Sequence, residues 1–229
     1  MSNETNKQYN LDIYDPFETI GFYDMPVIRK TEHMPKSLLG FNYAKSSKKY
    51  ESGIHFFLDD YQFERLWRSP QTYINMLSEF DCVLTPDFSL YTDMPKAMMI
   101  WNTYRSRLLG NFWQQEGLTV VPTVSWADED SFDFCFDGLP LNSILAISTV
   151  GVKQTEKATQ IWIKGFEEMI ENCHPKKLIV YGPKLDYDMP GGIDIIYFPN
   201  EQTERLHKLE EKSNGRKRVK NNRKIKQKK

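Results

Sequence analysis

Two polar residues, Asp87 and Ser125, closely follow short apolar runs that have the character of buried strands. Asp87 comes after the run 82–85, and Ser125 comes after the run 118–121. In α/β proteins the C-terminal ends of parallel strands meet at one edge of the sheet, where sites are usually built. We therefore expect Asp87 to act there as a general acid or base, or as a metal ligand.

Two arginines, Arg105 and Arg107, lie in the helical segment between these strands. A guanidinium can fork onto a carboxylate or a phosphate, so either arginine is a candidate anion clamp beside Asp87. The alternative is structural: the arginines form a solvated face or an internal salt bridge, and Asp87 pairs with one of them or caps the next turn. The residues predicted to contact a ligand at the strand ends are Asp59, Ser89, Asn102, Thr123, Ser125 and Trp126.

Trp126 suits stacking on a base or a sugar, and packing under a loop is the competing interpretation. Asp59 and Asp60 end another apolar run and could join Asp87 in binding a divalent cation. Asp60 is, however, a natural N-cap for a helix that begins near residue 61, and we favour that interpretation. The sequence thus predicts no metal site and assigns no cofactor.

The four histidines lie far apart and show no metal-ligand spacing, and His55 sits inside an apolar run, as a core histidine would. The three cysteines are scattered and lack the close pairing of a zinc site. No nucleophile elbow, P-loop or dinucleotide-binding glycine pattern is present. Scattered thiols, the absence of a long apolar run and an N-terminus unlike a secretory signal predict a reduced cytoplasmic protein with no membrane association.

Short apolar runs alternate with amphipathic segments along most of the chain. The runs predicted to be strands are 54–58, 82–85, 118–121, 144–148, 178–181 and 193–198, with a further short strand at 27–28. The segments predicted to be helical are 62–80, 95–116, 156–173 and 202–212. Ser69 and Pro70 should restart the first helix as its N-cap and first position, and Gly117 should end the second.

Uniformly apolar strands separated by helices are typical of a parallel sheet covered on both faces. The sequence therefore predicts an α/β fold with about six mostly parallel strands and covering helices. Right-handed crossovers leave two arrangements open, an incomplete (β/α) barrel-like sheet and a doubly wound sheet. The small or polar residues at every strand end favour the barrel-like form.

The formal net charge of −1 hides two unlike parts. Residues 212–229 hold ten Lys or Arg and no acid, whereas the rest of the chain holds 20 basic and 31 acidic residues, a balance of −11. We predict a disordered N-terminus at 1–10, one α/β domain at 11–211 and a disordered basic tail at 212–229. The tail is expected to bind DNA or RNA through counterion release, and a tail that serves only solubility is the alternative. The expected contacts are Arg216, Lys217, Arg218, Lys220, Arg223 and Lys224.

One long block carries a family resemblance. It comprises Thr85-Pro86-Asp87-Phe88-Ser89, Pro95, Trp101-Asn102, Tyr104-Arg105-Ser106-Arg107, Gly110, Trp113-Gln114, Gly117 and Val121-Pro122-Thr123-Val124-Ser125-Trp126. The block resembles an uncharacterised domain family of firmicute-type bacteria, their phages and other mobile elements. The resemblance spans most of 15–200 and implies a phage or mobile-element setting, with no chemistry attached.

These features favour an accessory phage protein that associates with nucleic acid through its tail. An enzyme acting on a phosphorylated or nucleotide-like small molecule at the strand ends is one alternative. A non-catalytic binder of a host protein is another, because the acidic body resembles nucleic acid in its charge. Neither DNA nor RNA is preferred, and the sequence does not indicate the oligomeric state.

Overall fold

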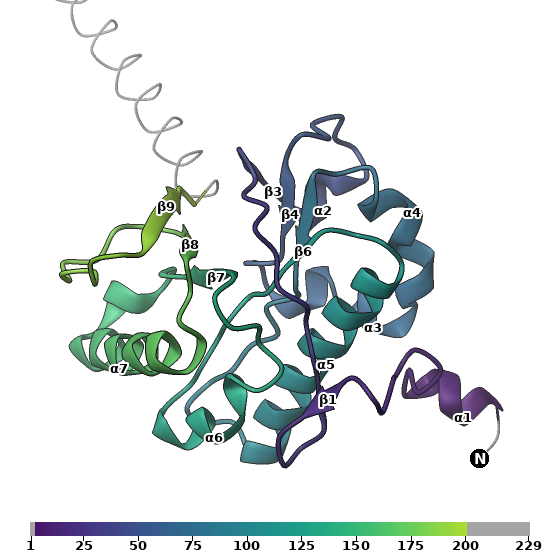
Figure 1. The fold of residues 1–229 in the computed structure, drawn as a ribbon, viewed down its shortest axis with the longest axis horizontal. Helices are drawn as coiled ribbons and strands as arrows, with labels where there is room; N and C mark the ends of the chain where they lie inside the picture. The colour runs from purple at the N-terminus through teal and green to yellow at the C-terminus, as the bar shows by residue number, and fades with distance from the viewer. Residues whose placement is uncertain (1–2, 201–229) are drawn as a thin grey trace, which may run out of the picture. The chain divides into compact units, whose positions relative to one another are not determined.

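The computed structural model describes residues 3–200 (Figure 1). One compact unit extends through Phe198, and the chain from Pro199 onward belongs to a second. The predicted helix at 202–212 and the predicted basic tail lie outside the described residues.

Seven parallel strands in two sheets form the centre of the compact unit. The four-stranded sheet contains β3 (Leu38–Gly40), β4 (Gly53–His55), β5 (Cys82–Leu84) and β6 (Val120–Val121). The three-stranded sheet contains β7 (Ile144–Ser148), β8 (Lys177–Tyr181) and β9 (Asp194–Phe198). Every pair of neighbouring strands in them is parallel. The predicted α/β class is confirmed, and strands occupy all six principal positions expected from the sequence.

A single parallel bridge joins the two sheets, between Thr123 and Ala146 of β7. Ala146 donates to the Pro122 carbonyl at 2.8 Å, and Val124 donates to the Ala146 carbonyl at 2.8 Å. The strands thus follow one another in chain order, without the reversal that a doubly wound sheet requires. Among the described residues no ladder joins β3 to β9, so the barrel is not closed.

The sheets are strongly curved. The rings of His55 on β4 and Tyr181 on β8 have centroids 4.4 Å apart, although β5, β6 and β7 separate these strands. In a flat sheet, four strand spacings would hold them about 19 Å apart. The concave face so formed is apolar across both sheets. Its buried residues are Leu38, Cys82, Leu84, Val121, Ile144, Ala146, Ile179 and Tyr181.

Two long helices match their predicted bounds closely. They are α5 (Lys96–Gln115) and α7 (Glu156–Cys173). The Thr155 hydroxyl caps α7 by accepting from the Ala158 backbone N–H at 3.1 Å. Gly117 follows α5 with φ +86°, a left-handed conformation that suits glycine and ends the helix. Figure 1 shows α5 beneath the four-stranded sheet and α7 beside the three-stranded one.

The other helical turns are short. They are α1 (Asn3–Gln8), α2 (Phe41–Ala44), α3 (Arg65–Arg68), α4 (Ile74–Leu77), α6 (Phe132–Cys135) and 3₁₀ helices at Asp60–Gln62, Pro70–Tyr73, Glu129–Ser131 and Val152–Gln154. The predicted helix 62–80 is therefore broken into pieces. Pro70 cannot donate a backbone hydrogen bond, and Ser69 leaves the helical region at φ −153° and ψ 67°. The break was predicted correctly, but the Ser69 side chain makes no cap bond.

The N-terminal region differs most from expectation. Residues 3–8 form α1 where disorder was predicted, and Asn10 after it donates to the Trp67 carbonyl at 2.7 Å. The strands β1 (Thr19–Ile20) and β2 (Met25–Pro26) form an antiparallel pair. The strand predicted at 27–28 is displaced by two residues, because β2 ends at Pro26. β3 was not predicted, because three residues give too short a pattern to recognise.

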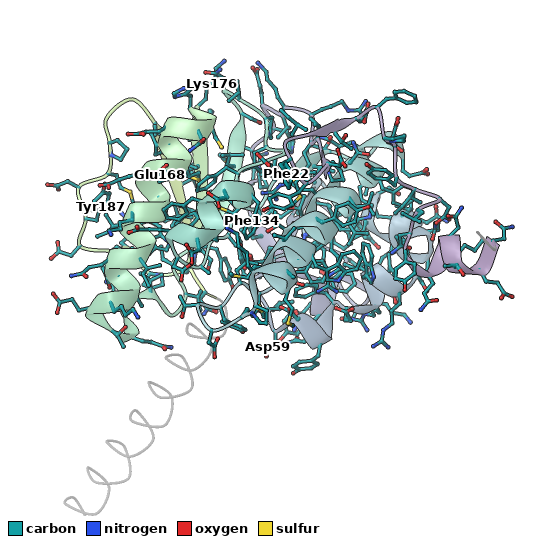
Figure 2. The ribbon with its side chains drawn as sticks, turned by 90° about the horizontal axis from the view of Figure 1, so that it is seen from below. Phe22, Asp59, Phe134, Glu168, Lys176 and Tyr187 are labelled. Carbon is teal, nitrogen blue, oxygen red and sulfur yellow. The ribbon has the colours of Figure 1, made fainter. Side chains whose placement is uncertain are left out.

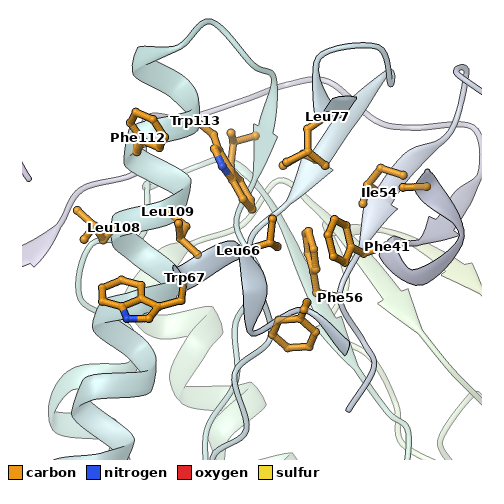
Figure 3. Packing of buried hydrophobic residues seen from close by; sticks show 14 of the residues in the cluster. Phe41, Ile54, Phe56, Leu66, Trp67, Leu77, Leu108, Leu109, Phe112 and Trp113 are labelled. Carbon is orange, nitrogen blue, oxygen red and sulfur yellow. The ribbon is translucent and has the colours of Figure 1, made fainter. Parts of the chain in front are cut away.

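The core beneath the four-stranded sheet places α5 against the strands and the short helices. Figure 3 shows Leu109 and Trp113 of α5 facing Leu66 and Phe56. Full burial of one such large apolar side chain contributes about 1.5–3 kcal/mol. A second cluster packs α7 against β7 and β8 through Phe166, Met169, Leu145 and Val180. These clusters hold the strand ends in place.

Candidate functional site

The ends of β5 and β6 meet as the sequence predicts. Thr85 donates its N–H to the Val121 carbonyl at 3.0 Å, and its hydroxyl accepts from the Thr123 N–H at 2.8 Å. These bonds align the two chains beyond their strands and bring Asp87 beside Ser125. The Ser125 hydroxyl donates a hydrogen bond to the Asp87 carboxylate.

Asp87 is the half-buried carboxylate of this site. Burial raises its pKa to about 7, the Ser125 hydrogen bond opposes the rise, and the negative charge of Asp60 adds to it. A carboxyl group that titrates near neutral pH can both donate and accept a proton under ordinary conditions. This property suits a general acid or base.

Asp60 holds the loop that follows Asp87. Its carboxylate accepts from the Ser89 N–H at 3.2 Å to each oxygen and from the Ser89 hydroxyl at 2.8 Å. Asn102 of α5 donates to the Ser89 carbonyl at 2.7 Å. The interpretation of Asp60 as an N-cap was wrong. The cap position of the 3₁₀ helix is occupied by Asp59, whose side chain makes no cap bond. The Asp60 carboxylate bonds Ser89 instead.

Arg105 is paired within the fold. Its Nη1 donates to both carboxylate oxygens of Glu64, at 3.0 and 2.9 Å, and its Nη2 donates to Asn102 Oδ1 at 2.6 Å. The guanidinium also lies 3.8 Å from the ring centroid of Phe88. A continuous network therefore runs from Asp60 through Ser89, Asn102 and Arg105 to Glu64. This geometry matches the structural alternative of an internal salt bridge, and through Asn102 the bridge also connects to the loop that follows Asp87.

Arg107 is buried and points the other way. Its three nitrogens donate to backbone carbonyls, Nε to Asp137 at 2.9 Å, Nη1 to Thr123 at 3.2 Å and Nη2 to Cys135 at 2.7 Å. Burial lowers its pKa to about 10, which leaves it charged at neutral pH. Arg107 would have to release a carbonyl to clamp a ligand anion.

A small cavity lies beside this network, lined by Asn102, Thr123 and Ser125 among others. It has room for about one water molecule. The buried Thr123 hydroxyl has no hydrogen-bond partner among the described residues. Because buried hydroxyls are nearly always satisfied, this cavity is suited to a water or a small polar group of a ligand.

The remaining predicted contacts do not join this cluster. Asp59 is exposed, and its carboxylate accepts a long 3.4 Å hydrogen bond from Gln62 Nε2. Figure 2 shows Asp59 at one side of the molecule and Lys176, just before β8, at the opposite side. The Trp126 ring packs against Gly165 of α7, where an added Cβ would lie 2.2 Å from its Nε1. The six predicted nucleic-acid contacts of the tail lie outside the described residues.

Two features of the site escaped the sequence analysis. Glu64 lies 41 residues before Arg105, and no local pattern indicates their pairing. Asp60 was expected to cap the helix that follows it. Its actual partner, Ser89, lies 29 residues further along the chain, where no local pattern points to it. The prediction of His55 as a core histidine is confirmed, because it is buried and burial lowers its pKa to about 3, which keeps the ring neutral.

Residues 17–199 match the sequence family described as Domain of unknown function (DUF4417). The chain belongs to this family. It is 40% identical over 195 residues to "Gene 1 protein" of Mycobacterium phage L5, covering 82% of this chain and 85% of that protein. It is 37% identical over 185 residues to "Gene 1 protein" of Mycobacterium phage D29, covering 79% and 68%. No solved structure matches the chain significantly.

These relatives confirm the phage association of the family, and the predicted firmicute setting stays a prediction. The names of the DUF4417 relatives carry no activity to this chain. Among the described residues, every helix is too short or too polar to cross a bilayer.

Replacing Arg107 with Met should lower the free energy of unfolding by about 3 kcal/mol or more, because three buried carbonyls lose their donor. Urea unfolding of the variant and the wild type measures the difference. Arg68→Met, on an exposed arginine, is the matched control and should change stability by no more than about 0.5 kcal/mol. A loss below about 1 kcal/mol for Arg107→Met would contradict the role of Arg107 in satisfying these three carbonyls.

Asp87→Asn should change how stability depends on pH. The folded chain keeps the Asp87 proton up to about pH 7, whereas an unfolded Asp loses it near pH 4. Between about pH 4 and pH 7 folding therefore binds a proton. The contribution of Asp87 to the free energy of unfolding falls as the pH rises through this range. The slope is at most about 1.4 kcal/mol per pH unit.

The asparagine variant lacks this loss, so its stability relative to wild type should rise between pH 4 and 7 and level off above. Urea unfolding at pH 5 and pH 8 measures it, with Asp59→Asn as the exposed control. A difference between variant and wild type that is the same at both pH values would show that Asp87 is not held neutral.

Proposed function

We propose that this DUF4417 protein is a phage accessory protein that associates with DNA or RNA through its basic C-terminal segment. The observation that carries the proposal is the separation of charge. Residues 212–229 hold ten Lys or Arg and no acid, while the rest of the chain has a balance of −11. An acidic body repels polyanions, so the basic segment is the part able to attract them.

The strand-end site has a separate role in this proposal. Asp87 and Ser125, with Thr123 and Asn102 at the cavity beside them, offer hydroxyl, amide and carboxyl groups to a small polar ligand. In the described part of the chain, the arginines near them are Arg105, which is held by Glu64, and Arg107, which is held by backbone carbonyls. The site is therefore poor in free positive charge, and nucleic-acid phosphates are expected to bind at the basic segment.

Fluorescence anisotropy with short DNA and RNA tests the association at two salt concentrations. The full chain should bind both, and a chain ending at Glu211 should not. A full-length variant with Arg216, Lys217, Arg218, Lys220, Arg223 and Lys224 changed to Gln should bind weakly. For duplex DNA its slope of log affinity against log salt should shrink by about 5, as expected for six lost phosphate contacts.

The matched control removes six exposed lysines from the body, also as Gln. These are Lys36, Lys45, Lys48, Lys49, Lys153 and Lys157. Its affinity and salt slope should stay close to wild type. Equal affinity of the full chain and the chain ending at Glu211 would overturn the proposal.

A second candidate is an enzyme acting on a phosphorylated or nucleotide-like small molecule. The favouring observation is Asp87, whose pKa of about 7 and contact with Ser125 suit proton transfer. Asp87 would be the acid or base, with Ser125 and Asn102 as ligand contacts. Arg105 is paired with Glu64 and Arg107 with backbone carbonyls, which supports a positioning role for both in this candidate.

Screening the full-length protein against a panel of nucleotides and sugar phosphates tests this candidate. Where turnover is found, Asp87→Asn should lower kcat by about 10²–10⁴-fold, the usual contribution of general acid–base catalysis. Asp59→Asn should leave kcat unchanged, because Asp59 is exposed and outside the cluster. Turnover that survives Asp87→Asn in a folded variant would remove Asp87 from the chemistry.

A further inference from the structure

Three side chains with metal-binding atoms converge at the start of β5, at the end of the strand opposite Asp87. They are His33, Asp81 and Cys82, and one ligand atom of each lies within 4.8 Å of the other two. His33 Nε2 lies 2.8 Å from Asp81 Oδ2. His33 stands 48 residues before Asp81, so only the fold brings the three together.

The backbone around this cluster fixes two of its members. Asp81 donates its N–H to the Tyr50 carbonyl at 2.8 Å, and Cys82 is the first residue of β5. Cys82 pairs in register with Gly53 of β4. A Cβ at position 53 would lie 2.8 Å from the Cys82 sulfur, so the glycine leaves room for this thiol.

The cluster is accessible from one side. Cys82 is 2% exposed, whereas the side chains of His33 and Asp81 are 42% and 29% exposed. The side chains of His33 and Asp81 thus give the cluster its exposure to solvent, while the Cys82 thiol is buried.

We propose that His33, Asp81 and Cys82 form a zinc-binding site. One imidazole nitrogen, one carboxylate oxygen and one thiolate sulfur are a ligand set that zinc accepts, and the thiolate and imidazole disfavour Mg²⁺ and Ca²⁺. Tetrahedral zinc places its ligand atoms about 3.3–3.7 Å apart. The side chains thus need to move only slightly from their separations of 2.8 Å to 4.8 Å.

Three protein ligands leave the fourth position of a tetrahedral ion to water. This site is independent of the proposed nucleic-acid association and of Asp87. It lies where the strands begin, and its ligands come from the segment before β3 and from the start of β5. Zinc there would connect these two segments directly.

The test uses the full-length protein stripped of metal with a chelator. Calorimetric titration with Zn²⁺ should give one ion per chain with a micromolar or tighter Kd. Titration with Co²⁺ should give the visible bands of a tetrahedral ion together with a thiolate-to-cobalt charge-transfer band. The charge-transfer band reports the Cys82 sulfur, which a simple His33–Asp81 ion pair would not produce.

His33→Ala is the decisive variant, because this exposed side chain can be removed with the fold intact, as a circular dichroism melt will show. It should weaken Zn²⁺ binding at least about 100-fold, since loss of a ligand exceeds the 10–100-fold cost of losing a supporting partner. Cys82→Ala should abolish the charge-transfer band. His207→Ala and Cys173→Ala are the matched controls and should bind as wild type does.

Three results would each overturn the proposal directly, and a fourth comes from the control. They are the absence of Zn²⁺ binding at micromolar concentrations, wild-type binding by His33→Ala, and a Co²⁺ complex without a thiolate band. Loss of binding in His207→Ala alone would also overturn it, because the ion would then be held elsewhere.

Discussion

The buried guanidinium of Arg107 is the interaction on which the arrangement of the two sheets depends. One parallel bridge, at Thr123, joins them, and Arg107 donates to the carbonyl of that same residue. It also donates to the carbonyls of Cys135, the last residue of α6, and of Asp137, both in the connection between β6 and β7. A cation taken out of water is costly unless its donors are satisfied, and charge-assisted bonds to three carbonyls offset that cost. Helix α5 thus fixes the segment between β6 and β7, and with it Ser125.

The same packing explains why Asp87 differs from its acidic neighbours. Glu64 has Arg105, and Asp60 accepts a backbone N–H and a hydroxyl, so both carboxylates are compensated. Asp87 has the Ser125 hydroxyl and faces the charge of Asp60. A half-buried carboxyl with one neutral donor and a nearby negative charge gains most by keeping its proton. The loop network and the high pKa of Asp87 therefore have one origin, the tight closure of α5 onto the strand ends.

Sequence patterns were sufficient where structure is local. The 3.6-residue period set both bounds of α7, and the apolar runs located six strands. They failed where tertiary contacts decide. The failures are β3, the breaks within 60–77 other than the one at Ser69, and the partners of Asp60, Arg105 and Arg107. The sequence placed Asp87 and Ser125 at one edge because parallel strands share their C-terminal ends. It could not show which acids are compensated, because their partners lie 29 to 41 residues away in the chain.

Charge separation also limits what the two parts of the protein can do together. With a balance of −11, the body adds repulsion to any nucleic acid that the basic segment attracts. That repulsion is screened beyond about 8 Å at physiological salt, so it acts mainly on direct contact. In the proposed function a polyanion is therefore held by residues 212–229, while direct contact with the acidic body stays unfavourable. Among the described residues the site at Asp87 offers no free arginine, so the phosphate of a ligand bound there would have to stay exposed to solvent.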